Sequence, residues 1–467
     1  MVDSEKTLRR GTLSLWEAFA QGLGTNGPAA VTALFFVSLA GIVAGSLPLV
    51  VTLAFVIYLG MTLIAYEWSK EVASAYSWAA YHRRGFKRAG RFLSFYAGTT
   101  YYYYYLLGYT GFAVLGLSSF LYVIFPGIAS AYPWIWMPIT IAVILETSIL
   151  NYFGIKPSMR YVLYTGIAEI AFLLLTSIAL IALNPGKVSI IPYTTQPISG
   201  NLSTLLVAMV LGIATFGGLN TVVPVAEETK DPKRNVPLAL ALLAGILGLT
   251  IILNCYSQTI SYGVANMINY ANIPDPGIFV YTTYLGVIVA GIFAVFIANS
   301  FNSSGVSFET AAVRTSYAFS RDGILFPSSL SKINKHGVPG RMVIFNATLA
   351  TIIALVSGIV LGPLTAGVFL IISNSIFSLS NHAIAGIGLI FYHGRRKTLR
   401  IVVHVIIPIL VSIAIAIAIF YTVYPAPPVP LNYSAWIAGI FLACIIIAYI
   451  LYRRQPEKLD KVGEFSL

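Results

Sequence analysis

The sequence predicts an all-α polytopic membrane protein with twelve transmembrane helices. Of its 467 residues, 58% are hydrophobic and 9% are charged, and the mean hydropathy is +0.83. Soluble domains carry about 25% charged residues. Apolar segments of the ~20 residues that cross a bilayer recur along the chain, and basic residues gather at every second connection between them. The two cysteines indicate neither a disulfide framework nor a metal cluster.

The twelve apolar segments are separated by short polar connections. They lie near residues 13–43, 48–80, 92–125, 133–153, 160–183, 200–226, 236–263, 277–318, 342–361, 363–392, 400–424 and 432–452. The segment at 48–80 exceeds one span, so we expect part of it to lie along the interface. The tails at 1–12 and 453–467 are too short to fold alone.

Charge predicts the orientation of these spans. If both termini are cytoplasmic, nearly all of the 28 lysines and arginines fall on the cytoplasmic side, and Lys187 is the exception. The net charge of +12 therefore reflects topology and does not indicate nucleic-acid binding. We expect a plasma-membrane protein surrounded by the lipid bilayer, with no obligatory protein partner.

The first apolar segment is interrupted by residues that disfavour a helix. AQGLGTNGPA, residues 20–29, contains Gly22, Gly24 and Gly27, and Pro28 lacks an N–H and crowds the carbonyl of Gly24. A helix that restarts near Pro28 presents free N–H groups that suit a carboxylate. The alternative is that the glycines form a close packing surface between helices.

A second interruption lies five segments later. GIATFGGLNTVVP, residues 212–224, again combines glycines with a proline, and Pro224 frees the carbonyl of Asn220. The odd spacing makes the two segments cross the membrane in opposite directions. Such pairs indicate a transporter of inverted repeats with a midplane site. We therefore predict five-helix repeats at 13–183 and 200–392, two further helices within 400–452, and discontinuous spans 1 and 6.

Two connections carry motifs of a known family. VAEETKDPKRNVPLAL, residues 225–240, resembles the stretch after span 6 in the amino acid–polyamine–organocation superfamily, with its acidic pair at Glu227 and Glu228. RTSYAFSRDGILFPSSLSKINKHGVPGR, residues 314–341, is similar to the element that follows span 8 in that superfamily. The resemblance covers the topology of the whole chain and the motifs of these two loops.

The resemblance implies a LeuT-like fold that binds its substrate at the two breaks. It implies that the substrate α-carboxylate meets the helix start after the first break, and that the α-amino group meets span 6 carbonyls. The predicted substrate-binding residues are Gly22, Gly24, Thr25, Asn26, Gly27, Phe216, Gly217, Gly218 and Asn220, with Tyr102 and Tyr105 as candidates for the cavity wall. The family often carries an acid at the position of Asn220, and its loss disfavours arginine-type substrates.

Polar residues within the spans are candidates for ion coupling. A buried carboxyl is costly in a membrane, so Glu169 in span 5 is a candidate proton carrier, and a hydrogen-bond network between helices is the alternative. Ser303 and Ser304 in span 8 stand where sodium-coupled relatives supply hydroxyl ligands. Oxygen ligands suit such cations, and interhelical hydrogen bonding is again the alternative.

These observations predict a secondary active amino-acid transporter that works by alternating access. We expect proton-coupled symport of neutral amino acids, and the alternatives are exchange, sodium symport or polyamine transport. No catalytic residue, resident metal or cofactor is expected, and the coupling ion is the proton or, in the alternative, Na⁺. The chain lacks the clustered nucleophiles or acid–base groups of an enzyme, the filter loops of a channel and the phosphate-binding loop of a pump.

Overall fold

The computed structural model describes residues 7–116, 124–273, 275–373, 375–424 and 432–466. Within these residues the regular structure is helical, apart from one isolated β-bridge between Leu13 and Thr229. The helices are α1 (Leu15–Asn26), α2 (Pro28–Val43), α3 (Leu47–Glu71), α4 (Trp78–Gly85), α5 (Gly90–Val114), α7 (Pro126–Ala131), α8 (Trp136–Tyr152), α9 (Ile155–Leu183), α10 (Leu202–Ala214), α11 (Leu219–Val222), α12 (Pro232–Tyr262), α13 (Pro276–Leu285), α14 (Val287–Arg321), α15 (Gly340–Leu361), α16 (Pro363–Ser373), α17 (Ser375–Arg396), α18 (Ile407–Val423), α19 (Tyr433–Tyr452) and α20 (Pro456–Lys461).

The described part of the chain has nine helical stretches that are long and apolar enough to cross a membrane. They confirm the prediction of a helical, multi-pass membrane protein. α8 is a shorter apolar helix, and residues 117–123 of the predicted third span lie outside the described residues. The predicted segment at 48–80 divides into α3 and the start of α4. The count of twelve spans stays a prediction.

Both predicted interruptions coincide with helix boundaries. α1 ends at Asn26 and α2 begins at Pro28, with only Gly27 between them. α10 ends at Ala214, and α11 begins at Leu219 after a four-residue turn. α11 then continues into a 3₁₀ turn, Val223–Glu228, that contains Pro224.

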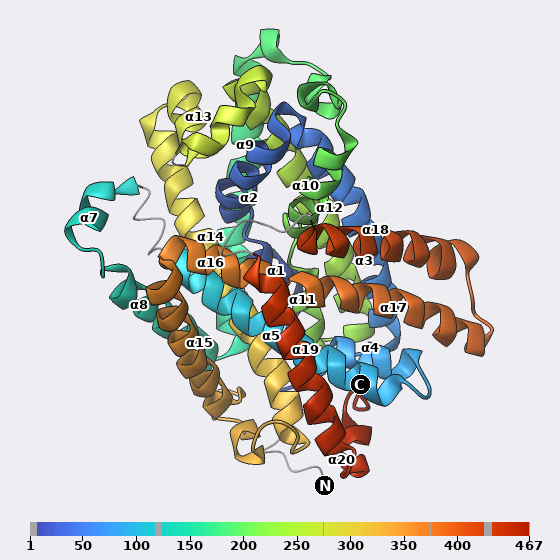
Figure 1. Cartoon of the computed structure of the whole chain (residues 1–467). Coiled ribbons are helices and arrows are strands. Elements are labelled where there is room, and N and C mark those ends of the chain that lie inside the picture. The colour runs from blue at the N-terminus through green and yellow to red at the C-terminus, as the bar shows by residue number, and fades with distance from the viewer. Residues whose placement is uncertain (1–6, 117–123, 274, 374, 425–431, 467) are drawn as a thin grey trace.

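α1 and α11 lie near the centre of the molecule (Figure 1). α1 packs against α9, α12, α14 and α11, and α5 packs along α14. The start of α1 is fixed by a capping box in which the Ser14 N–H donates to Glu17 Oε2 at 2.9 Å. The Leu13 N–H donates to Glu228 O at 3.0 Å, and the Lys230 N–H donates to Leu13 O at 2.8 Å. The two interrupted segments are therefore tied together at one end.

The two ends of the molecule differ in the segments they carry. The turns at 185–200 lie at the top of Figure 1, and α20 lies at the bottom. α4 is joined to α20 by an ion pair between Arg83 and Asp460, so these elements share the lower end. Arg83 and Arg91, from a connection that the charge pattern predicts to be cytoplasmic, pair with Asp460 at this end.

Candidate functional site

Gly27 is the residue at which span 1 changes direction. Its φ of 56° is left-handed, and it caps the end of α1 and the start of α2 at once. Glycine adopts this conformation without the penalty that a Cβ carries. The Gly27 N–H still bonds to Leu23 O at 3.0 Å, and Pro28 occupies the first position of α2, as predicted. The break is one residue long.

Gly22 and Gly24 lie inside α1 and serve packing. A Cβ on Gly22 would lie 2.5 Å from a Leu243 methyl carbon, and a Cβ on Gly24 would lie 2.4 Å from Ser307 Oγ. Neither glycine lines the central cavity. These contacts favour the packing alternative for both glycines, and their role as substrate contacts stays a prediction.

The first amides of α2 do not face the central cavity. The Ala29 N–H donates to Glu169 Oε1 at 2.6 Å, and the Ala30 N–H donates to Ser300 Oγ at 3.2 Å. The helix start does attract a carboxylate, as its dipole and free donors require. That carboxylate belongs to the chain itself. The predicted cradle for a substrate carboxylate at this helix start is therefore occupied by Glu169.

The two carbonyls that the prolines free from the helix ladder both accept a side-chain hydroxyl. Ser304 Oγ donates to Gly24 O at 2.9 Å, and Tyr105 Oη donates to Asn220 O at 2.7 Å. A buried carbonyl without a donor would cost about 1–3 kcal/mol. Tyr105 therefore supports the second break from behind, and Ser304 supports the first.

Asn26 links the two breaks directly. Its Nδ2 donates to Thr215 O and Gly217 O, each at 3.0 Å. Those carbonyls belong to the turn after α10, which is where the family resemblance places the substrate amino group. Asn26 is 2% exposed, and its Oδ1 has no partner among the described residues. Because both amide hydrogens donate to carbonyls, the orientation of the Asn26 amide is determined, and its Oδ1 remains available as an acceptor.

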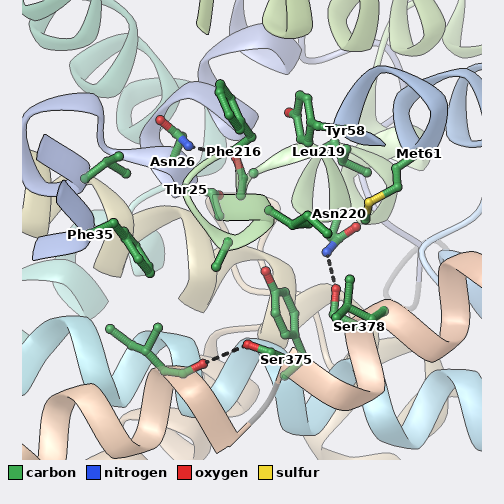
Figure 2. Close-up of a pocket in the computed structure, with 18 of the residues that line it drawn as sticks. Thr25, Asn26, Phe35, Tyr58, Met61, Phe216, Leu219, Asn220, Ser375 and Ser378 are labelled. Atoms are coloured by element: carbon green, nitrogen blue, oxygen red, sulfur yellow. Dashed lines mark hydrogen bonds between the residues drawn. The ribbon is translucent and has the colours of Figure 1, made fainter. Parts of the chain in front are cut away.

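A cavity of ≈ 80 Å³ lies between the breaks and the facing helices α3, α5, α14 and α17 (Figure 2). Six of the predicted substrate-binding residues line it: Thr25, Asn26, Phe216, Gly217, Gly218 and Asn220. Its remaining wall is mostly apolar and aromatic: Val31, Phe35, Tyr58, Met61, Tyr104, Phe112, Ile213, Ala214, Leu219, Phe308, Ile371, Ser375, Ser378 and Leu379. Ligand pockets usually measure about 300–1,000 Å³, so this cavity is small in the conformation that the structure shows.

Aromatic rings form one side of the cavity. Phe216 is fully buried, and its ring centroid lies 5.5 Å from Tyr58 and 5.3 Å from Phe55. On the opposite side, Asn220 Nδ2 donates to Ser378 Oγ at 2.7 Å (Figure 2). Asn220 Oδ1, like that of Asn26, has no partner among the described residues.

The tyrosine run in α5 contributes a different residue from those predicted. Tyr104 lines the cavity, whereas Tyr102 donates to Asn346 Oδ1 at 2.8 Å and packs against Phe326. Neither Tyr102 nor Tyr105, the predicted candidates, is among the residues that line the cavity in this structure. The rotation of α5 about its axis decides this, and a run of five identical residues contains no signal of that rotation.

Two of the buried glutamates accept hydrogen bonds from neutral groups. Glu169 is 1% exposed and accepts hydrogen bonds from the Ala29 N–H and, at 2.9 Å, from Ser300 Oγ. Glu309 is fully buried and accepts from Ser148 Oγ and Asn151 Nδ2, both at 2.7 Å. The ion pairs found in the described residues include neither glutamate. The sequence analysis did not single out Glu309, although an acid in an apolar helix was the available signal.

The family motifs meet at the lower end of the bundle. Arg314 and Glu228 form a pair with Nε to Oε2 at 2.8 Å and Nη2 to Oε1 at 3.3 Å, and both side chains are buried. Arg321 pairs with Glu227 at 3.1 Å. Glu227 also accepts from the Ala75 N–H at 2.7 Å. The loops at 225–240 and 314–341 therefore form one ion-pair cluster below the cavity, which we call the exit cluster (Glu227, Glu228, Arg314 and Arg321).

Fold and site together define a transporter rather than an enzyme. The crystal structure of MhsT in complex with L-phenylalanine matches with a TM-score of 0.60 and 15% identity, over 88% of this chain and 100% of that one. The structural similarity establishes a shared fold, and a shared fold does not by itself imply a shared function. The family model described as amino acid permease matches residues 13–450. The chain belongs to this amino acid permease family.

Several curated proteins are similar to this chain in sequence. The Amino-acid permease BAT1 homolog of Oryza sativa subsp. japonica is 31% identical over 36% of this chain and 34% of its own length. The Methylthioribose transporter of Bacillus subtilis (strain 168) is 24% identical over 70% and 66%. The Branched-chain amino acid permease BcaP of the same strain is 26% identical over 45% and 44%. The matched stretches thus span less than two thirds of each relative.

Proposed function

We propose that this protein is a secondary active transporter of neutral amino acids that works by alternating access in the plasma membrane. The proposal includes twelve spans with both termini cytoplasmic, and spans 1 and 6 broken at Gly27 and at 215–218. The observation that carries it is the cavity between the two breaks, lined by apolar side chains and by two amide oxygens that have no partner among the described residues. Family membership and the fold shared with MhsT, whose structure contains L-phenylalanine, support it.

The polar end of the cavity fits an amino group. Asn26 Oδ1 and Asn220 Oδ1 are buried acceptors for which the described part of the chain supplies no donor. A buried acceptor left unpaired costs about 1–3 kcal/mol, so a ligand that brings N–H donors gains by pairing with it. The carbonyls of Thr215 and Gly217 already accept from Asn26. We therefore assign the substrate amino group to the two asparagine oxygens, in place of span 6 carbonyls.

The side-chain end of the cavity fits an uncharged, apolar group. No charged residue lines the cavity as the structure describes it, and Phe35, Met61 and Phe112 are among its walls. A cationic side chain would be buried without a partner, which is strongly unfavourable. This favours neutral amino acids over arginine-type substrates and polyamines.

A chemical double-mutant cycle tests the amino-group assignment. We expect L-leucine to raise the thermal stability of the purified protein, and its 2-hydroxy analogue, which lacks the amino group, to bind about tenfold or more weakly. In Asn26→Leu we expect a smaller ratio between the affinities for L-leucine and for its 2-hydroxy analogue. Asn381→Leu is the matched control, because Asn381 Oδ1 is also buried without a partner but does not line the cavity. An unchanged affinity ratio in Asn26→Leu overturns the assignment of the amino group. The proposed function is overturned if none of the neutral amino acids stabilises the protein.

Glu169 is the proposed proton carrier. It is buried with neutral partners at the start of α2, so its charge depends on whether the bundle around it opens to water. Protonation weakens its hold on the Ala29 N–H and the dipole of α2. This links proton binding to the geometry of the break.

Sodium coupling remains the second candidate. Ser303 Oγ donates to Asn299 O at 2.8 Å, and Ser304 Oγ donates to both Gly24 O and Ser300 O at 2.9 Å. These hydroxyls are used in helix packing in this conformation, which favours the hydrogen-bonding alternative. A sodium site would require the α1–α14 contact to separate.

Reconstitution in liposomes distinguishes the coupling ions. We expect an inward pH gradient to drive accumulation of a labelled neutral amino acid, and a sodium gradient at constant pH to drive none. Glu169→Gln is expected to lose gradient-driven accumulation and keep exchange of internal for external substrate. Glu309→Gln, a second buried glutamate with two neutral partners, is the control. Full accumulation by Glu169→Gln excludes this residue as the carrier, and sodium-driven accumulation transfers the role to the Ser303 and Ser304 region.

A further inference from the structure

Residues 456–466 fold back onto the lower end of the bundle. They comprise α20 and the turn that follows it, and Leu459 and Val462 are 2% and 0% exposed. Gly463 has a φ of +73°, and a Cβ there would lie 2.6 Å from Ala79 O. Such close backbone approach at a left-handed residue requires glycine. The segment is therefore docked in one position and is not a free tail.

Charge fixes this segment to the α4–α5 side of the bundle. Asp460 Oδ1 accepts from Arg83 at 2.8 Å, and its two oxygens accept from Arg91 Nε and Nη2, both at 2.6 Å. The bidentate geometry with Arg91 is the strong form of this contact. Hydrogen bonding to Arg91 and Arg83 lowers the pKa of Asp460 from its usual value, so the carboxylate keeps its charge at neutral pH.

The end of the segment reaches the exit cluster. The Phe465 ring lies 4.4 Å from the guanidinium carbon of Arg321, the residue that pairs with Glu227. Cation–π contacts of this kind are attractive. The Ala73 N–H donates to Ser466 Oγ at 3.0 Å, only two residues from Ala75, whose N–H bonds Glu227.

We propose that residues 456–466 act as a clasp that holds the cytoplasmic exit closed and must release before the exit opens. The clasp binds α4 and α5 through Asp460 and binds α14 through Phe465. Ser466 also ties the clasp to the connection at 72–77, and the exit cluster joins that connection to α14 through the contacts of Glu227 with Ala75 and Arg321. This connection and α14 are the two sides that the clasp and the cluster both hold. Opening toward the cytoplasm separates these sides, so it breaks clasp and cluster together. This inference rests on the proposed alternating access, but it concerns the gate and not the substrate.

Cysteine labelling tests the clasp without any substrate. In a background with Cys255 and Cys444 replaced, Ala318→Cys places a thiol at a fully buried position, on the α14 face shared by Arg314 and Arg321. Inside-out vesicles expose the cytoplasmic face to a membrane-impermeant thiol reagent. The rate of labelling then reports how often the exit opens.

Asp460→Asn is expected to raise the labelling rate about fivefold, the factor expected from two partly exposed ion pairs of modest strength. Phe465→Ala is expected to raise it too, because Arg321 loses its cover. The matched control is Glu457→Gln, a charge removal at an exposed site of the same helix, which leaves the rate unchanged. Unchanged labelling in both Asp460→Asn and Phe465→Ala overturns the clasp. So does equal acceleration by Glu457→Gln, since it would reflect charge alone. If the unsubstituted protein transports no amino acid, while Asp460→Asn and Phe465→Ala still raise the labelling rate as expected, the proposed function is overturned and the clasp is supported.

Discussion

Replacing Gly27 by alanine tests the claim that the first break depends on a single residue. Two costs add at this position. An alanine at φ 56° carries a left-handed penalty of about 1–2 kcal/mol. Its Cβ would also lie 2.6 Å from Ser304 Oγ and 3.0 Å from Ser300 O. Overpacking of a tight site costs about 1–3 kcal/mol, so we expect a total loss of about 2–5 kcal/mol in the free energy of unfolding.

Gly11 separates the two costs. It has a φ of +67°, and no atom lies within 4 Å of a Cβ built there. Gly11→Ala therefore carries the backbone penalty alone, about 1–2 kcal/mol. Both variants are measured by denaturant titration in mixed micelles, followed by tryptophan fluorescence. If Gly27→Ala loses no more stability than Gly11→Ala, the close packing of Gly27 on α14 does not constrain the break and the reasoning fails.

Three further predictions concern buried polar groups. Glu228→Gln strands the buried Arg314 guanidinium and is expected to cost about 3–5 kcal/mol, whereas the double variant Glu228→Leu/Arg314→Met recovers most of it; equal losses in the two denaturant titrations would contradict this. Tyr105→Phe leaves the freed carbonyl of Asn220 without its donor and should lower stability by about 1–3 kcal/mol, and a neutral result in the same titration would show that water replaces the hydroxyl. Burial raises the pKa of Asp275, in the α12–α13 connection, to about 6. Because the folded-state pKa is above the unfolded one, its contribution to stability is present below about pH 4 and is lost as pH rises through 6; Asp275→Asn should flatten the thermal midpoint between pH 4 and 7, and an unaltered slope would exclude this carboxyl as the cause.

The membrane class and the two breaks follow from the sequence alone. Scarce charge and recurring apolar segments leave a helical membrane protein as the consistent solution, because a bilayer offers no partner to an unpaired backbone group. Pro28 begins α2, since a proline cannot continue the hydrogen-bond ladder. Pro224 lies after the second break, in the 3₁₀ turn that follows α11. The motifs at 225–240 and 314–341 are specific enough to indicate the family by themselves.

Only the tertiary structure decided which residues face the cavity. Gly22 and Gly24 share the break motif with Gly27, but Leu243 and Ser307 press against them, so the packing of neighbouring helices separates spacers from the hinge. Likewise, Tyr104 faces the cavity because α5 is rotated by its contacts with α14.

The tertiary structure also decided which side chains form hydrogen bonds with the backbone groups that are freed at the breaks. A proline shows which carbonyl loses its partner, and hydrogen bonding requires that some donor replaces it. The donors came from Ser304 and Tyr105, and the acceptor at the start of α2 came from Glu169. They lie on other helices, far away in the sequence. Local chemistry therefore determined where the chain needs partners. Long-range packing determined which side chains supply them and which polar atoms, such as Asn26 Oδ1, have no partner among the described residues.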